Sequence, residues 1–202
     1  VYKGALDNAS GISFLLELMR NFSSLKFPIR DIIFVALNGE EMGLIGSDAF
    51  ASKYKDTLSG AEVINFDMIG VDNIPVTFIL GKDSKNSYSS LLNNLENICN
   101  SKNIEYLENY ANSSDHASFI NNNFDSLTIS HSDTTNIHTP NDTADKISAP
   151  AIYNVYELIS DEIKNYAYND IFLLFYDSKI ILFFTISSFL LVSFRIIKIK
   201  KF

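Results

Sequence analysis

Carboxylate side chains and one histidine stand at positions in this sequence where they could bind a metal ion. In chain order they are Asp7, Glu40, Glu41, Asp67 and His138. Asp7 precedes the first predicted helix, and the others follow apolar segments that read as strands. Because ligands gather outside the carboxyl ends of strands in open α/β sheets, we expect these side chains to meet at one edge of the sheet. Such a group repels itself unless a cation neutralises it, and oxygen and imidazole ligands suit catalytic zinc or another first-row metal.

Composition narrows the classes of protein that fit. The chain has 202 residues, 47% of them hydrophobic and 20% charged, which suits one domain with a substantial core and excludes wholesale disorder. Sixteen basic against 24 acidic residues give a net charge of −8, which argues against a nucleic-acid partner. The single cysteine, Cys99, permits no internal disulfide and excludes a cysteine-built zinc site.

Each acidic candidate also has a structural interpretation when it is taken alone. Asp7 or Asn8 is as well suited to be the N-cap of a helix that begins near Ala9 as to bind a metal ion. The adjacent Glu40 and Glu41 fit a solvated turn. Asp67, which follows a predicted strand, fits a turn residue.

The later candidates have similar alternatives. His138 lies in a polar loop, where a histidine is most often simply exposed. Asp142 or Thr143 is predicted to cap the helix that follows. The metal hypothesis therefore rests on the joint appearance of all these residues.

The elements that must position these residues alternate between helices and apolar strands. A helix is predicted over Gly11–Arg20, with its apolar face formed by Ile12, Leu15, Leu16 and Met19. Two further helices are predicted over Asn86–Ser101 and Ala149–Tyr166. Strands are predicted over Asp31–Leu37, Glu62–Phe66, Val76–Leu80 and Ser126–Ser130, the first of them covered on both faces. This alternation indicates an α/β fold with a largely parallel sheet.

The C-terminal segment differs in character from the rest. Residues 180–194 form a run of fifteen without a charge, bounded by Lys179 and Arg195, and residues 179–202 carry five basic residues and no acidic one. A full span needs about 20 apolar residues, and snorkelling of the flanking cations extends a shorter one. We therefore expect residues 1–168 to form an extracytoplasmic domain and residues 169–202 a transmembrane helix with a basic cytoplasmic tail. The alternative is a buried C-terminal helix or strand.

Five motifs occur in an order that resembles the M28 family of metallopeptidases, the co-catalytic dizinc aminopeptidases. They are GALDNASG (Gly4–Gly11), NGEEMGLIGS (Asn38–Ser47), NFDMIG (Asn65–Gly70), SDHASF (Ser114–Phe119) and HTPNDTADKI (His138–Ile147). The resemblance covers residues 4–147. It implies a three-layer zinc-aminopeptidase fold in which helices flank a mixed sheet.

The resemblance also implies a role for each candidate. Asp7 corresponds to the carboxylate that bridges two zinc ions, Glu41 and His138 to terminal ligands of one ion, and Asp67 to a ligand of the other. Glu40 corresponds to the general base that takes a proton from the attacking water.

The resemblance carries further expectations, and at two positions this chain departs from the family pattern. The family has a cis peptide bond after the bridging aspartate, here between Asp7 and Asn8. Asp115 and His116 are expected either to line the cleft, to support the metal site or to make structural hydrogen bonds. The tyrosine that precedes the final histidine in some members is Ile137 here. A histidine ligand that stands before the first motif in the family is absent from this sequence, so we expect weak and asymmetric zinc loading of this chain.

The function that the resemblance implies is hydrolysis of N-terminal residues from peptides, by the C-terminal part of a membrane-tethered zinc aminopeptidase whose N-terminal segment is missing. Three alternatives stay open: a glutaminyl-cyclase-like acyltransferase on the same scaffold, a catalytically inactive membrane-tethered ectodomain, and a gene fragment without a function of its own. The sequence does not fix the oligomeric state.

Overall fold

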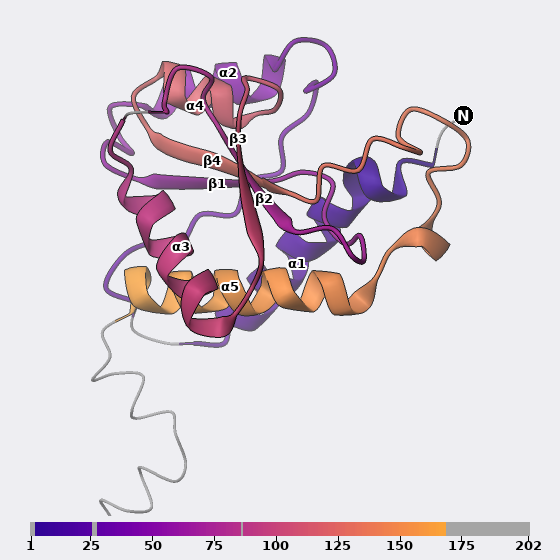
Figure 1. Ribbon diagram of the computed structural model, residues 1–202. Helices are drawn as coiled ribbons and strands as arrows, with labels where there is room; N and C mark the ends of the chain where they lie inside the picture. Colours follow the sequence, from indigo (N-terminus) through magenta and orange to yellow (C-terminus); the bar gives the residue numbers. More distant parts are fainter. Residues whose placement is uncertain (1–2, 26–27, 86, 169–202) are drawn as a thin grey trace, which may run out of the picture. The chain divides into compact units, whose positions relative to one another are not determined.

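The computed structural model describes residues 3–25, 28–85 and 87–168 (Figure 1). The chain divides into two units: Val1–Ser24 with Ile33–Glu162, and Leu25–Ile32 with Ile163–Phe202. No helix among the described residues is both long and apolar enough to cross a membrane. The predicted span at residues 180–194 lies outside the described residues, so it stays a prediction.

A four-stranded mixed sheet forms the centre of the first unit. Its strands are β1 (Glu62–Phe66), β2 (Val76–Leu80), β3 (Tyr106–Tyr110) and β4 (Asp125–Ser130), in the spatial order β1-β4-β2-β3. β1 is parallel to β4 and β2 to β3, but β2 runs antiparallel to β4. The largely parallel sheet expected from the alternation of elements is therefore mixed, as the family resemblance implied.

Helices cover both faces of this sheet, which gives three layers (Figure 1). On one face lie α2 (Ile45–Tyr54) and α4 (His116–Asn121), and on the other lie α1 (Gly11–Phe22) and α3 (Ser90–Lys102). Two short elements, the π-helical η1 (Ala5–Ser10) and the 3-10 helix η2 (Ala144–Lys146), precede α1 and the last helix, α5 (Ala149–Ala167). The α/β class and the helices predicted near α1, α3 and α5 are confirmed.

The core of the first unit lies where the central strands meet their covering helices. All five residues of β2 are buried, as are Leu127 and Ile129 of β4. Leu91 and Leu95 of α3 are fully buried as well. Burial of side chains this size stabilises a fold by about 1.5–3 kcal/mol each relative to exposure, so this face of the sheet provides a firm base for the loops at its edges.

The helix predicted at the first apolar stripe exists, but its buried face is a different one. Phe14, Leu18 and Phe22 are buried, whereas Leu16 is 55% exposed and Met19 is 42% exposed. The reason is that Phe14 packs edge-on against the last residue of β1, with ring centroids 4.8 Å apart.

The strand predicted over Asp31–Leu37 is wrong. These residues have no regular secondary structure and are exposed or half-exposed, with Ile33 55% exposed. A short apolar segment becomes a strand only when a neighbour completes its hydrogen bonds, and none of the described strands pairs with this segment. Leu37, at its end, packs against the small cluster of Ala51, Phe119 and Phe124.

The described part of the second unit is small. The Ile29 N–H donates to the carbonyl of Ala167 at 2.7 Å. The Arg30 guanidinium lies over the ring of Tyr166, 4.1 Å from its centroid, a favourable cation–π distance.

Candidate metal centre

The backbone around Asp7 is held by residues far away in the sequence. The Asp142 carboxylate, which is only 2% exposed, accepts hydrogen bonds from the N–H groups of Leu6 at 2.7 Å and Asp7 at 3.1 Å. The expectation that Asp142 or Thr143 caps the following helix is wrong: Thr143 is the N-cap residue of η2 and makes no side-chain capping bond. Asp142 instead fixes the segment that carries Asp7.

Asn8 ties the same segment to the end of β1. Its amide donates to the carbonyl of Phe66 at 2.8 Å, and its side-chain oxygen accepts from the N–H of Gly11 at 3.1 Å. The peptide bond between Asp7 and Asn8 is cis, as the resemblance implied. Asp7 is therefore placed beside Asp67, the residue that follows β1.

The glutamate pair lies in a tight loop before α2. Glu40 accepts hydrogen bonds through its carbonyl from the N–H groups of Gly43 at 3.0 Å and Leu44 at 2.9 Å. Gly39 and Gly43 have positive φ values of 79° and 97°, which favour glycine. The loop thereby turns sharply enough for the adjacent glutamates to face different neighbours.

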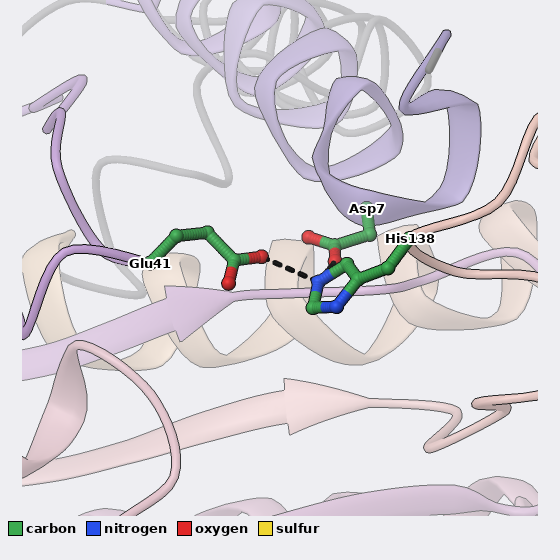
Figure 2. Close-up of side chains that lie close together, drawn as sticks. All are labelled: Asp7, Glu41 and His138. Carbon is green, nitrogen blue, oxygen red and sulfur yellow. Dashed lines mark hydrogen bonds and ion pairs between the residues drawn. The ribbon is translucent and has the colours of Figure 1, made fainter. Parts of the chain in front are cut away.

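His138, Glu41 and Asp7 come together at this edge of the sheet (Figure 2). The Nε2 atom of His138 lies 2.6 Å from Glu41 Oε1 and 3.1 Å from Asp7 Oδ2. One ligand atom from each residue lies within 4.8 Å of the others. Zinc bound at about 2.0–2.2 Å separates tetrahedral ligand atoms by about 3.4 Å. The two distances at His138 Nε2 are hydrogen-bond distances that would have to lengthen to admit the ion, whereas the donor set of two carboxylates and one imidazole fits zinc as it stands.

A cavity of about 630 Å³ is lined by all of the acidic candidates. Asp7, Glu40, Glu41, Asp67 and Asp115 all line it. Burial, followed by the charge of Asp67, raises the pKa of Glu40 to about 7, and burial raises the pKa of Asp67 to about 6. Burial and then the charge of Glu41 raise the pKa of Asp7. The cavity therefore favours protonation, or a cation, over a set of bare carboxylates.

The pKa of His138 is raised as well, and for an imidazole this favours the charged form. Its hydrogen bond to Glu41 and the charge of that residue raise the pKa of the imidazole. A bound divalent cation and a protonated His138 satisfy the same carboxylates, so they are alternative occupants of this place.

Asp115 and His116 have separate environments. Asp115 lines the cavity, and its Oδ1 atom is buried with no hydrogen-bond partner. His116 is fully buried and does not line the cavity; its ring bonds to Thr128 and to the carbonyl of Ala111, both at 2.9 Å. Of the interpretations left open for His116, lining the cleft is excluded.

Three residues that support the site are not among those selected from the sequence as candidates. Asp142 holds the backbone of Asp7, and Ser114 Oγ donates to Asp67 Oδ2 at 2.7 Å. Asn65 in turn donates to Ser114 at 2.8 Å. All three lie inside the recognised motifs, but motif membership alone does not say which side chain bonds to which.

Comparisons with known proteins agree with this geometry. A "Probable zinc metalloprotease" of Pyrenophora tritici-repentis is 46% identical over 68 residues, which are 33% of this chain and 15% of that protein. Aminopeptidase YwaD of Bacillus subtilis is 41% identical over 73 residues, again 33% of this chain and 15% of that protein.

Solved structures match over most of the chain. An aminopeptidase from Aneurinibacillus sp. strain AM-1 is 28% identical with a TM-score of 0.71, over 83% of this chain and 40% of that one. A glutaminyl cyclase from Porphyromonas gingivalis, 20% identical with a TM-score of 0.65 over 82% of this chain and 67% of that one, shares the fold. The chain thus spans less than half of the length of the aminopeptidase. The family model of peptidase family M28 matches residues 1–163, and the chain belongs to that family.

Proposed function

We propose that this chain carries most of the catalytic site of a zinc-dependent aminopeptidase that removes N-terminal residues from peptides. The observation that carries the proposal is the convergence of Asp7, Glu41 and His138 within 4.8 Å, beside a cavity that also holds Glu40 and Asp67. The names of similar proteins support zinc and aminopeptidase chemistry in particular.

The proposed site holds two zinc ions. Asp7 would hold both ions, Glu41 and His138 would hold one of them, and Asp67 would hold the other. Bound zinc supplies a Lewis acid that polarises the scissile carbonyl and lowers the pKa of water. The acidic wall of the cavity attracts the substrate's free amine.

Glu40 is the proposed general base. It takes a proton from the attacking water and gives it to the leaving amine. Burial in the cavity wall, which raises the pKa of Glu40 to about 7 in the metal-free site, favours a role in accepting a proton. That pKa follows from its burial beside the charges of Asp67 and Glu41.

A membrane anchor belongs to the same proposal. The uncharged run at residues 180–194 and the basic residues that flank it support a single span with the catalytic domain outside the cytoplasm. Protease protection of the catalytic domain in sealed membrane vesicles tests this orientation.

The test of the catalytic assignment is Glu40→Gln in the natively expressed protein. We expect kcat on leucyl anilides to fall by about 10²–10⁴-fold, because the amide cannot accept the proton, while zinc stoichiometry stays unchanged. Chelation of zinc should abolish turnover, and added zinc should restore it. Asp48→Asn, an exposed acid in α2, is the matched control and should keep wild-type activity. Loss of zinc from Glu40→Gln, or full turnover by it, would contradict the assignment.

The glutaminyl cyclase fold match supplies the second candidate. Product analysis separates the two: an aminopeptidase releases free leucine from leucyl anilides, whereas a cyclase converts N-terminal glutamine to pyroglutamate. Pyroglutamate as the main product from a glutaminyl peptide would favour the cyclase.

A further inference from the structure

A continuous series of hydrogen bonds runs from the buried face of α4 to Asp67. The carbonyl of Ala111 bonds to His116 at 2.9 Å, and His116 bonds to Thr128 at 2.9 Å. Asn65 bonds to Thr128 at 3.0 Å and to Ser114 at 2.8 Å, and Ser114 bonds to Asp67 at 2.7 Å. These side chains come from β1, β4 and α4 and the loop before it, so the series crosses the face of the sheet that α4 covers.

The donor and the acceptor in the first bonds are fixed by chemistry. A carbonyl only accepts, so the Nε2 atom of His116 must donate to Ala111. Burial lowers the pKa of His116 and keeps the ring neutral at pH 7, which leaves Nδ1 as an acceptor. The Thr128 hydroxyl therefore donates to Nδ1.

The remaining bonds follow from the same reasoning. The Thr128 hydroxyl uses its hydrogen in the bond to the imidazole, so toward Asn65 it is the acceptor of one amide hydrogen. The other hydrogen of that amide goes to Ser114 Oγ. Ser114 then has its single proton free for Asp67 Oδ2. Every member has a compatible partner, which makes such a network rigid.

We propose that His116, Thr128, Asn65 and Ser114 are positioning residues that hold the Asp67 carboxylate in one orientation for a metal ion. The inference rests on the proposed zinc function of this site. Ser114 occupies Oδ2 of Asp67, so Oδ1 is the oxygen left to face the ion. Partners of this kind around metal ligands typically govern metal affinity by 10–100-fold.

The position of Thr128 makes it the decisive link. It is fully buried in the central strand β4, its register partner is Asn65 on β1, and it joins the histidine half of the series to the amide half. Thr128→Val preserves the shape of the side chain and removes both the donor and the acceptor. Thr128→Ser keeps the hydroxyl and should rescue the function.

The experiment is a titration of the metal-free, natively expressed protein with Zn²⁺ in competition with a chromogenic chelator, paired with urea unfolding. Thr128→Val should weaken one zinc-binding step by about 10–100-fold, and Thr128→Ser should bind zinc as the wild type does. Thr77→Val is the matched control, because Thr77 is a buried threonine on the neighbouring strand β2 and lies outside the series. Ser114→Ala removes the two bonds nearest to Asp67 and should weaken the same step even if Thr128→Val folds poorly.

Two results would overturn the inference. Zinc affinity that is unchanged in Thr128→Val and Ser114→Ala, with or without a loss of stability, would show that the series only holds α4 on the sheet. An Nδ1–H tautomer of His116, observed by ¹⁵N NMR of the zinc-free protein, would reverse the direction of the bonds and also refute it. A wild-type protein that binds no zinc contradicts the proposed function instead, and the tautomer alone then decides whether the series runs toward Asp67.

Discussion

Removal of the Asp142 carboxylate is expected to loosen the segment that carries Asp7. The two residues are 135 positions apart, yet Asp142 accepts hydrogen bonds from the N–H groups of Leu6 and Asp7. Asp142→Ala leaves the buried N–H of Leu6 without an acceptor, while the half-buried N–H of Asp7 can find water.

The magnitude follows from these contacts. A hydrogen bond to a charged group contributes about 1.5–3 kcal/mol, so two such bonds amount to about 3–6 kcal/mol. Asp142→Ala also removes the free-energy cost of burying the carboxylate, and this offsets part of that loss. We expect Asp142→Ala to lower the free energy of unfolding by about 2–4 kcal/mol, which corresponds to a fall in Tm of about 10 °C for a domain of this size.

Urea and thermal unfolding of Asp142→Ala and Asp142→Asn measure the effect. The asparagine keeps one acceptor oxygen and turns an amide toward the other N–H, so it should lose about half as much or more. Asp145→Ala, an exposed acid three residues further on, serves as the control and should unfold like the wild type. Wild-type stability of Asp142→Ala would mean that these two bonds contribute nothing net, and would refute the argument that this contact holds Asp7.

Two other substitutions give distinct signatures. Glu162 in α5 is 2% exposed, and its burial raises its pKa from near 4.5 to about 7, so its ionisation should reduce stability as the pH rises through this range. Glu162→Gln should therefore be more stable than the wild type by about 1–3 kcal/mol at pH 8 and equal to it at pH 4; the half-exposed Glu157→Gln is the control, and a pH-independent difference would contradict the prediction. Gly11→Ala should lower the free energy of unfolding by about 3 kcal/mol, because a Cβ there would overlap the backbone oxygen of Phe66 and the side-chain oxygen of Asn8; an unchanged urea midpoint would show that α1 can shift freely.

Much of the central sheet is predictable from local sequence. β1 and β2 are short runs rich in valine, isoleucine and phenylalanine, and β4 has Leu127, Thr128 and Ile129 in succession; the strand assignment of all three was confirmed. β3 was missed because its sequence, YLENY, is half polar and its residues are largely exposed. It becomes a strand through its pairing with β2, a long-range contact that no local pattern records.

The errors at α1 and at residues 31–37 have one physical cause. Both segments are apolar on more than one side, so the local sequence does not decide which side is buried or whether a strand forms. The elements that pack against each segment decide it. In α1 the stripe that includes Phe14 is buried because it meets Phe66. The segment at residues 31–37 has no described strand beside it and takes no regular form.

The candidate site has a buried half, formed by Asp7 and Asp67, and an exposed half, formed by Glu41 and His138. Asp7 is held through its backbone by Asp142, and Asp67 through its carboxylate by Ser114. Glu41 and His138, by contrast, are each 60% exposed at the side chain and are held chiefly by each other and by Asp7. Sequence motifs can identify both halves, but only the structure shows this difference in support. Without an ion, the buried half carries the cost that the raised carboxyl pKa values of Asp7 and Asp67 reflect. A divalent cation removes that cost and gives the exposed half a fixed partner, so the same ion that the ligand set fits is also the one that would bring the two halves into a single ordered site.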